Sequence, residues 1–148
     1  MSLNNISNNL ILELHVPDLD KAKAFYALFG FYELSSDPIT DDELGYLILA
    51  RNDEVLGRTI ICFYGGRESV SQQEYFVKFP SDTLRGYAVE TTIPVSNIDK
   101  LWDYVLPNLA SESIAQALEI KSWGVKDFRI VDPFGFYFRF TEIADWGQ

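Results

Sequence analysis

The feature that most constrains this chain is an order of elements that occurs twice: a strand, a helix and then three strands. In the first half, residues 11–16 alternate apolar and polar side chains, which predicts a half-buried strand. Pro17 ends this strand, Asp18 is a candidate N-cap, and apolar residues at helical spacing predict a helix over 19–29 that stops at Gly30. Three more strands are expected at residues 31–34, 45–51 and 59–64.

The second half follows the same plan. Residues 87–95 alternate again, Ser96 or Asn97 can cap a helix over 98–106, and Pro107 ends that helix. Three strands are expected at residues 117–122, 128–131 and 136–141, with a turn at Asp132-Pro133-Phe134-Gly135 before the last one. The duplication predicts an α+β chain of two βαβββ modules.

The predicted division of the chain follows from this plan. It consists of a flexible leader at 1–9, a first module at 10–64, a connecting segment at 65–86, a second module at 87–142 and a tail at 143–148. The connecting segment is long for a simple link, so we expect it to carry a strand or an arm of its own.

Composition excludes several functional classes. The 148 residues include 22 acids, 12 bases, one His and one Cys, which gives a net charge of −10. This acidity argues against nucleic acid as a partner and is compatible with a cationic ligand, although solubility alone is its more ordinary explanation. No apolar run reaches the ~18 residues that span a membrane, and no signal peptide is evident. The single Cys rules out an internal disulfide and fits a reducing cytoplasm.

Two motifs lie near the start of the first module and near the end of the second. The first is VPDLDKAKAFY at residues 16–26, followed by LFGF at 28–31, and the second is FRIVDPFGFYF at residues 128–138. With these motifs, the chain resembles the vicinal oxygen chelate superfamily, which includes glyoxalase I, extradiol dioxygenases and bleomycin resistance proteins. The resemblance spans residues 10–142. It implies that the paired modules form a curled mixed sheet around a cleft, with the helices outside and with Ile11, Glu13 and His15 facing the cleft.

The metal enzymes of that superfamily place one ligand on the first strand and one on a late strand of each module. The matching residues here are Ile11, Cys62, Glu90 and Arg139. An alkyl group and a guanidinium replace two of the donors that a divalent ion needs. We therefore expect no metal and no other cofactor.

Loss of these ligands on a retained fold is similar to the bleomycin resistance group. Members of that group sequester a drug as dimers, without chemistry, between stacking aromatic rings and acidic surfaces. The resemblance implies a cytoplasmic homodimer of the antibiotic-resistance type that binds a small organic ligand, for example a cationic aromatic one, with no catalytic residue and no nucleic-acid or membrane partner. The candidate ligand-binding residues are Ile11, Glu13, His15, Cys62, Tyr64, Glu90, Trp123, Tyr137 and Arg139.

Several of these candidates also have an ordinary structural explanation. His15 lies roughly 13 Å of strand beyond the metal position, which fits a plain strand-end histidine. Cys62 is the kind of small residue that fills a core, and Trp102 has the helical spacing of a core residue. Trp123 stands in a loop before the strand at 128–131 and is the strongest aromatic candidate.

Two alternatives remain open at this point. One is a metal-dependent enzyme, either a glyoxalase-like lyase or isomerase or an extradiol dioxygenase, with Glu13, His15, Glu90 and Glu142 as ligands at non-standard positions. The other is an interaction module without a small ligand. One geometric expectation is sharper: Glu90 and Arg139 should form an ion pair where the metal would otherwise lie.

Overall fold

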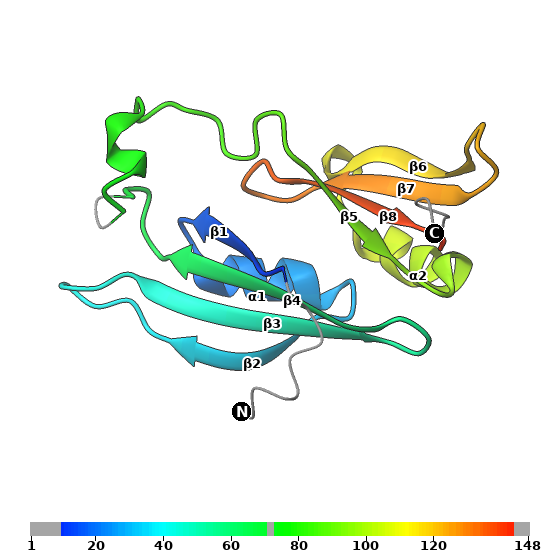
Figure 1. The fold of residues 1–148 in the computed structure, drawn as a ribbon, viewed down its shortest axis with the longest axis horizontal. Coiled ribbons are helices and arrows are strands. Elements are labelled where there is room, and N and C mark those ends of the chain that lie inside the picture. The colour runs from blue at the N-terminus through cyan, green and yellow to red at the C-terminus, as the bar shows by residue number, and fades with distance from the viewer. Residues whose placement is uncertain (1–9, 71–72, 144–148) are drawn as a thin grey trace. The chain divides into compact units, whose positions relative to one another are not determined.

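The computed structural model describes residues 10–70 and 73–143, and the leader and residues 144–148 of the tail lie outside the described residues (Figure 1). The chain divides into two compact units. The first unit consists of the chain up to Asn52 together with Gly57–Arg85, and the second consists of Asp53–Leu56 together with the chain from Gly86 onward. No helix in the described ranges is long and apolar enough to cross a membrane.

The first unit holds a four-stranded mixed sheet and one helix. Its strands lie in the order β1 (Leu12–Val16), β4 (Gly57–Gly65), β3 (Gly45–Asp53) and β2 (Tyr32–Asp37). β1 runs parallel to β4, and β2 runs antiparallel to β3. Helix α1 (Leu19–Ala27) packs against one face of this sheet (Figure 1).

Alternation along the strands explains why this face is apolar. Leu14 pairs with Phe63 in the β1–β4 register, and both side chains are buried. Tyr26 of α1 is fully buried and packs its ring 5.0 Å from that of Phe63. The predicted N-cap is confirmed, because the Asp18 side chain accepts a hydrogen bond from the Lys21 N–H at 2.9 Å.

The second unit repeats this arrangement. Its sheet has the order β5 (Glu90–Pro94), β8 (Tyr137–Thr141), β7 (Lys126–Val131) and β6 (Ile114–Ile120), and β5 runs parallel to β8. Helix α2 (Ile98–Val105) is capped by Asn97 and contributes Trp102, whose ring lies 4.9 Å from that of Phe128. Phe128 in turn stacks on Phe140 at 5.1 Å, so Trp102 is a core residue as predicted.

The predicted α+β fold of two βαβββ modules is therefore confirmed, and the differences are local. β5 begins at Glu90 instead of residue 87, because Gly86 and Ala88 have positive φ angles and Val89 donates to the Gly86 carbonyl in a turn. β6 begins at Ile114, earlier than predicted, and its pairing with β7 is interrupted by register shifts. Of the strand or arm expected in the connecting segment, no strand is found among its described residues after Gly65. They contain the short 3-10 helix η2 (Phe76–Lys78), and two more such turns, η3 (Leu106–Asn108) and η4 (Ser111–Ser113), follow α2.

Candidate functional site

Four of the predicted residues gather on one sheet face of the first unit, the face opposite α1. The parallel register pairs Glu13 with Cys62 and His15 with Tyr64. Because side chains two apart on a strand point the same way, all four share that face. Ile11 lies just before β1 and is exposed.

An open pocket of about 380 Å³ lies at this face. Glu13, Tyr46 and Tyr64 line it from three strands, and Glu43, Leu44, Gly45 and Gln73 complete it. The Tyr46 hydroxyl donates a hydrogen bond to Glu13 Oε1. The pocket therefore combines two carboxylates with two phenol rings.

The ionisation of the two tyrosines follows from this environment. Burial, and after it the hydrogen bond to Glu13, raises the pKa of Tyr46 far above its ordinary value of 10.0. Burial and the charge of Glu13 raise the pKa of Tyr64. Both phenols stay protonated at neutral pH, so Tyr46 acts as a donor to the Glu13 carboxylate and not as a base.

Cys62 is a core residue on the same face. It is 5% exposed and packs with Ala50 and Ile60, while Ile48 and Tyr46 cover the cluster. Burial raises the pKa of its thiol, so the reactive thiolate is disfavoured.

His15 is held by the end of the connecting segment. It is 7% exposed, its ring meets that of Tyr64 edge-on at 5.4 Å, and its Nδ1 lies 3.4 Å from Arg85 Nε and 3.3 Å from Arg85 Nη2. Arg85 Nη2 also pairs with Glu68 Oε2 at 3.2 Å. Burial and the Arg85 charge lower the pKa of His15, so its neutral ring accepts from Arg85. The buried Nε2 has no hydrogen-bond partner among the described residues, and a Cβ added at Gly65 would lie 3.1 Å from it.

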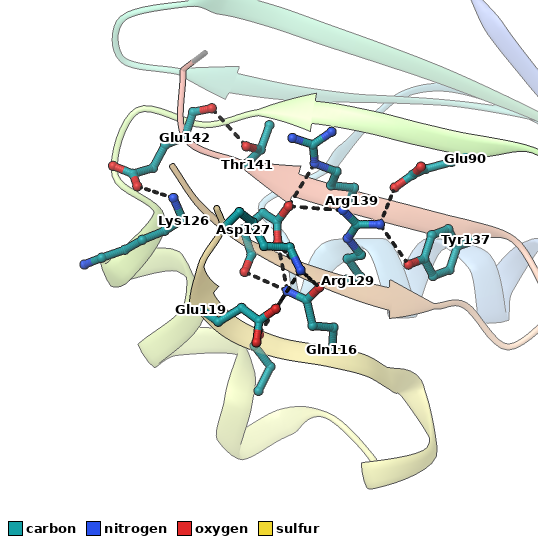
Figure 2. A network of polar contacts seen from close by, with 12 residues as sticks. Glu90, Gln116, Glu119, Lys126, Asp127, Arg129, Tyr137, Arg139, Thr141 and Glu142 are labelled. Atoms are coloured by element: carbon teal, nitrogen blue, oxygen red, sulfur yellow. Dashed lines mark hydrogen bonds and ion pairs between the residues drawn. The ribbon is translucent and has the colours of Figure 1, made fainter. Parts of the chain in front are cut away.

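In the second unit, the polar site is built around Asp127, which is fully buried (Figure 2). Its Oδ2 accepts from Arg139 Nε at 3.0 Å and from Arg129 Nη2 at 3.4 Å. Its Oδ1 accepts from Gln116 Nε2 at 2.7 Å and lies 4.0 Å from Lys121 Nζ. One carboxylate thus lies within 4.0 Å of three cationic side chains on the sheet face opposite α2.

The expected ion pair between Glu90 and Arg139 is wrong. Glu90 Oε1 pairs with Arg129 Nη1 at 3.1 Å, and Arg139 pairs with Asp127. β8 lies between β5 and β7, and Glu90 stands opposite Tyr137 on β8. Arg129 of β7 also contacts Tyr137, with 3.4 Å between Nη1 and Oη, so its guanidinium reaches across β8 to Glu90. Arg129 therefore supplies the cation for Glu90.

Trp123 and Tyr137 join the same network. Tyr137 Oη lies 3.4 Å from Arg129 Nη1. The Trp123 side chain follows β6, is 56% exposed, and has its ring centroid 5.6 Å from Arg139 Cζ and 5.9 Å from Lys121 Nζ. Four predicted residues, Glu90, Trp123, Tyr137 and Arg139, are thus connected within the second unit.

Sequence reasoning missed the residues that organise both sites. Asp127 fell one position outside the predicted strand at 128–131, although strand alternation would place its side chain on the same sheet face as that of Arg129. Tyr46 was inside the predicted strand at 45–51, and the alternation of side chains along that strand could have indicated which sheet face it occupies. Arg85 lies 70 residues from His15 along the chain, and no sequence signal connects the two.

The side chains at the superfamily's metal positions do not fit a divalent cation. Ile11 offers an alkyl group, Cys62 a buried protonated thiol, Glu90 a carboxylate held by Arg129, and Arg139 a guanidinium. Within residues 10–70 and 73–143, no three His, Cys, Asp or Glu side chains gather as a metal site.

The comparisons place this architecture among known folds. No protein-family model matches the chain, and no curated protein sequence matches it. Solved structures do match, and they define the class: the chain has the fold of the vicinal oxygen chelate superfamily, as its two motifs predicted.

The particular structures it resembles include two that are named for bleomycin. A bleomycin resistance determinant encoded on the transposon Tn5 matches with a TM-score of 0.62 and 18% identity, over 94% of this chain and 100% of the other. A bleomycin-binding protein complexed with bleomycin matches with a TM-score of 0.59 and 17% identity, over 93% and 100%. A glyoxalase/bleomycin resistance protein/dioxygenase family enzyme from Burkholderia phytofirmans PsJN matches with a TM-score of 0.64 and 17% identity, over 90% and 97%. At these identities the likeness establishes the fold.

Proposed function

We propose that this protein binds a small organic cation with an aromatic part in the pocket of the first unit and sequesters it without chemistry. The observation that carries the proposal is the composition of that pocket, in which Glu13 and Glu43 stand beside Tyr46 and Tyr64. A cation is attracted both to carboxylates and to the faces of aromatic rings. One structure of this fold, the bleomycin-binding protein, holds bleomycin, which supports a sequestering role.

The contacts within the pocket favour recognition of a charged ligand. The hydrogen bond from Tyr46 holds the Glu13 carboxylate in place before the ligand arrives, so less freedom is lost on binding. The net charge of −10 adds a long-range attraction for cations.

The same contacts support binding over catalysis. Tyr46 is a donor with a raised pKa, Cys62 is a buried thiol, and the unpartnered Nε2 of His15 adjoins Gly65 instead of lining the pocket. An activated nucleophile needs its proton removed or its pKa lowered, whereas the pKa values of Tyr46 and Cys62 are both raised and Tyr46 keeps its proton beside Glu13.

Calorimetric titration with a matched pair of probes tests the proposal. We expect (3-hydroxyphenyl)trimethylammonium to bind at least tenfold more tightly than 3-tert-butylphenol, its neutral isostere, and bleomycin to bind as well. Glu13→Gln should weaken binding of the cation at least tenfold. Glu33→Gln removes the same charge from an exposed pair with Lys23 and should leave the affinity within twofold. Equal affinities for the two probes, or full affinity in Glu13→Gln, would contradict the proposal.

Metal content separates this proposal from a metal-dependent enzyme. After exposure to Mn, Fe, Ni and Zn and desalting, we expect the protein to retain far less than one equivalent of any of them. Near one equivalent, lost on mutation of His15 or Glu90, would favour the enzyme instead.

A further inference from the structure

We propose a second binding site, on the second unit, at which Arg139 and Trp123 bind an aromatic carboxylate. This site is independent of the cation pocket in the first unit. It rests on an arginine whose outer edge is unused, an aromatic ring beside that edge, and a buried carboxylate that orients the arginine.

The arginine has donors to spare. Of the three Arg139 nitrogens, Nε alone has a partner within the described ranges, and that partner is Asp127. In Figure 2 the Nη end of Arg139 points away from Asp127. The Arg139 side chain is 16% exposed, so part of it is accessible to a ligand.

Arg139 offers free donors within a network whose charges balance. The cations of Arg139, Arg129 and Lys121 are matched by the carboxylates of Asp127, Glu90 and Glu119. Glu90 lies 3.1 Å from Arg129 and Glu119 lies 2.6 Å from Lys121, whereas Asp127 is the one carboxylate that pairs with Arg139 among the described residues. A ligand carboxylate would therefore be held by the spare N–H groups of Arg139 and not by an uncompensated charge.

Trp123 supplies the surface for the aromatic part of the ligand. Trp123 is 56% exposed, and its ring centroid lies 5.6 Å from Arg139 Cζ. A flat ligand can stack on this ring while its two carboxylate oxygens accept from the parallel N–H groups of the guanidinium. A monoanion fits better than a phosphate dianion, because Lys121 is already engaged by Glu119 and Gln116.

Titration followed by the indole N–H resonance of Trp123 tests the site, with phenylacetate as the probe and phenylacetamide as its neutral counterpart. Trp123→Phe assigns the resonance. We expect a saturable shift with phenylacetate and at least tenfold weaker binding of phenylacetamide. Arg139→Gln should weaken phenylacetate binding at least tenfold. Arg139→Lys keeps the charge but loses the parallel N–H groups of the guanidinium, so it should weaken binding severalfold.

Controls separate the site from general charge effects and from misfolding. Arg67→Gln removes the same charge from the first unit, where Arg67 donates to the Thr40 carbonyl, and should leave binding unchanged. Trp123→Ala alters only an exposed ring, so it should fold normally and lose binding severalfold in calorimetry.

Glu13→Gln should leave phenylacetate binding intact, which keeps this test distinct from that of the cation pocket. The proposal is overturned if phenylacetate does not shift Trp123, if phenylacetamide or inorganic phosphate binds as tightly, or if affinity survives in both Arg139→Gln and Trp123→Ala.

Discussion

At the scale of single residues, His15 shows how burial and one neighbour decide the state of a titratable group. Its ring is almost fully covered, and the guanidinium of Arg85 faces Nδ1. Tyr64 meets it from β4. A backbone hydrogen bond with Ser69 and, after it, the charge of Glu68, the carboxylate paired with Arg85, have smaller opposing effects on the pKa of His15. Protonation of His15 would place two cations against each other in a covered position.

This environment predicts a loss of stability in mild acid. The pKa of His15 in the folded protein lies below its ordinary value of 6.5, so the unfolded chain takes up the proton first. The contribution of neutral His15 is complete above about pH 6.5 and is lost as pH falls toward the lower folded-state pKa. In His15→Asn, whose amide oxygen can still accept from Arg85, the free energy of unfolding should fall less steeply over this range. Urea unfolding between pH 7.5 and 5 measures both slopes, and identical slopes would show that His15 titrates normally.

Residue-scale chemistry at the second site was the hardest part to predict. The match to the superfamily's metal positions grouped Glu90 with Arg139, and both belong to one network, but the match predicted the wrong partner for each. Both partners come from β7: Arg129 pairs with Glu90, and Asp127 pairs with Arg139. Pairing across a sheet is set by tertiary packing, which one sequence does not display.

At the scale of elements, most of the fold could be predicted, because each signal is local. Period-two alternation placed β1 and β5, and apolar residues at helical spacing placed α1 and α2. The errors lie where local signals conflict: a positive-φ turn delays β5, and irregular pairing accompanies the earlier start of β6. Of the two caps left open for α2, the structure uses Asn97, whose Oδ1 accepts from the Lys100 N–H at 3.3 Å.

The cap of α1 makes an element-scale prediction. Asp18 satisfies one of the unpaired N–H groups of the first turn, and its charge interacts favourably with the helix N-terminus. Asp18→Ala should lower the free energy of unfolding by about 1 kcal/mol, whereas Asp18→Asn, which keeps the acceptor oxygen, should cost only a few tenths. Chemical denaturation of the three proteins measures this order. An alanine variant as stable as the asparagine variant would mean that the hydrogen bond contributes nothing.

At the scale of the whole molecule, the dominant quantity is charge. The chain carries 22 acidic against 12 basic side chains. Several of the bases are already committed to local partners, as Lys126 is to Asp99 and Lys121 to Glu119. An exposed ion pair such as Lys126–Asp99 contributes little, so the surplus of negative charge acts mainly as self-repulsion in the compact state.

Added salt should therefore stabilise this protein. Raising NaCl from 10 to 150 mM shortens the screening length from about 30 to about 8 Å, which weakens repulsion between distant carboxylates more than it weakens contacts inside the Asp127 network. The midpoint of urea unfolding at pH 7.5 should rise over this range, and KCl should act as NaCl does, because screening depends on ionic strength and not on the identity of the cation. Stability that falls with salt would show that the ion pairs outweigh the repulsion. A response to only one of the two cations would instead indicate that this cation binds specifically.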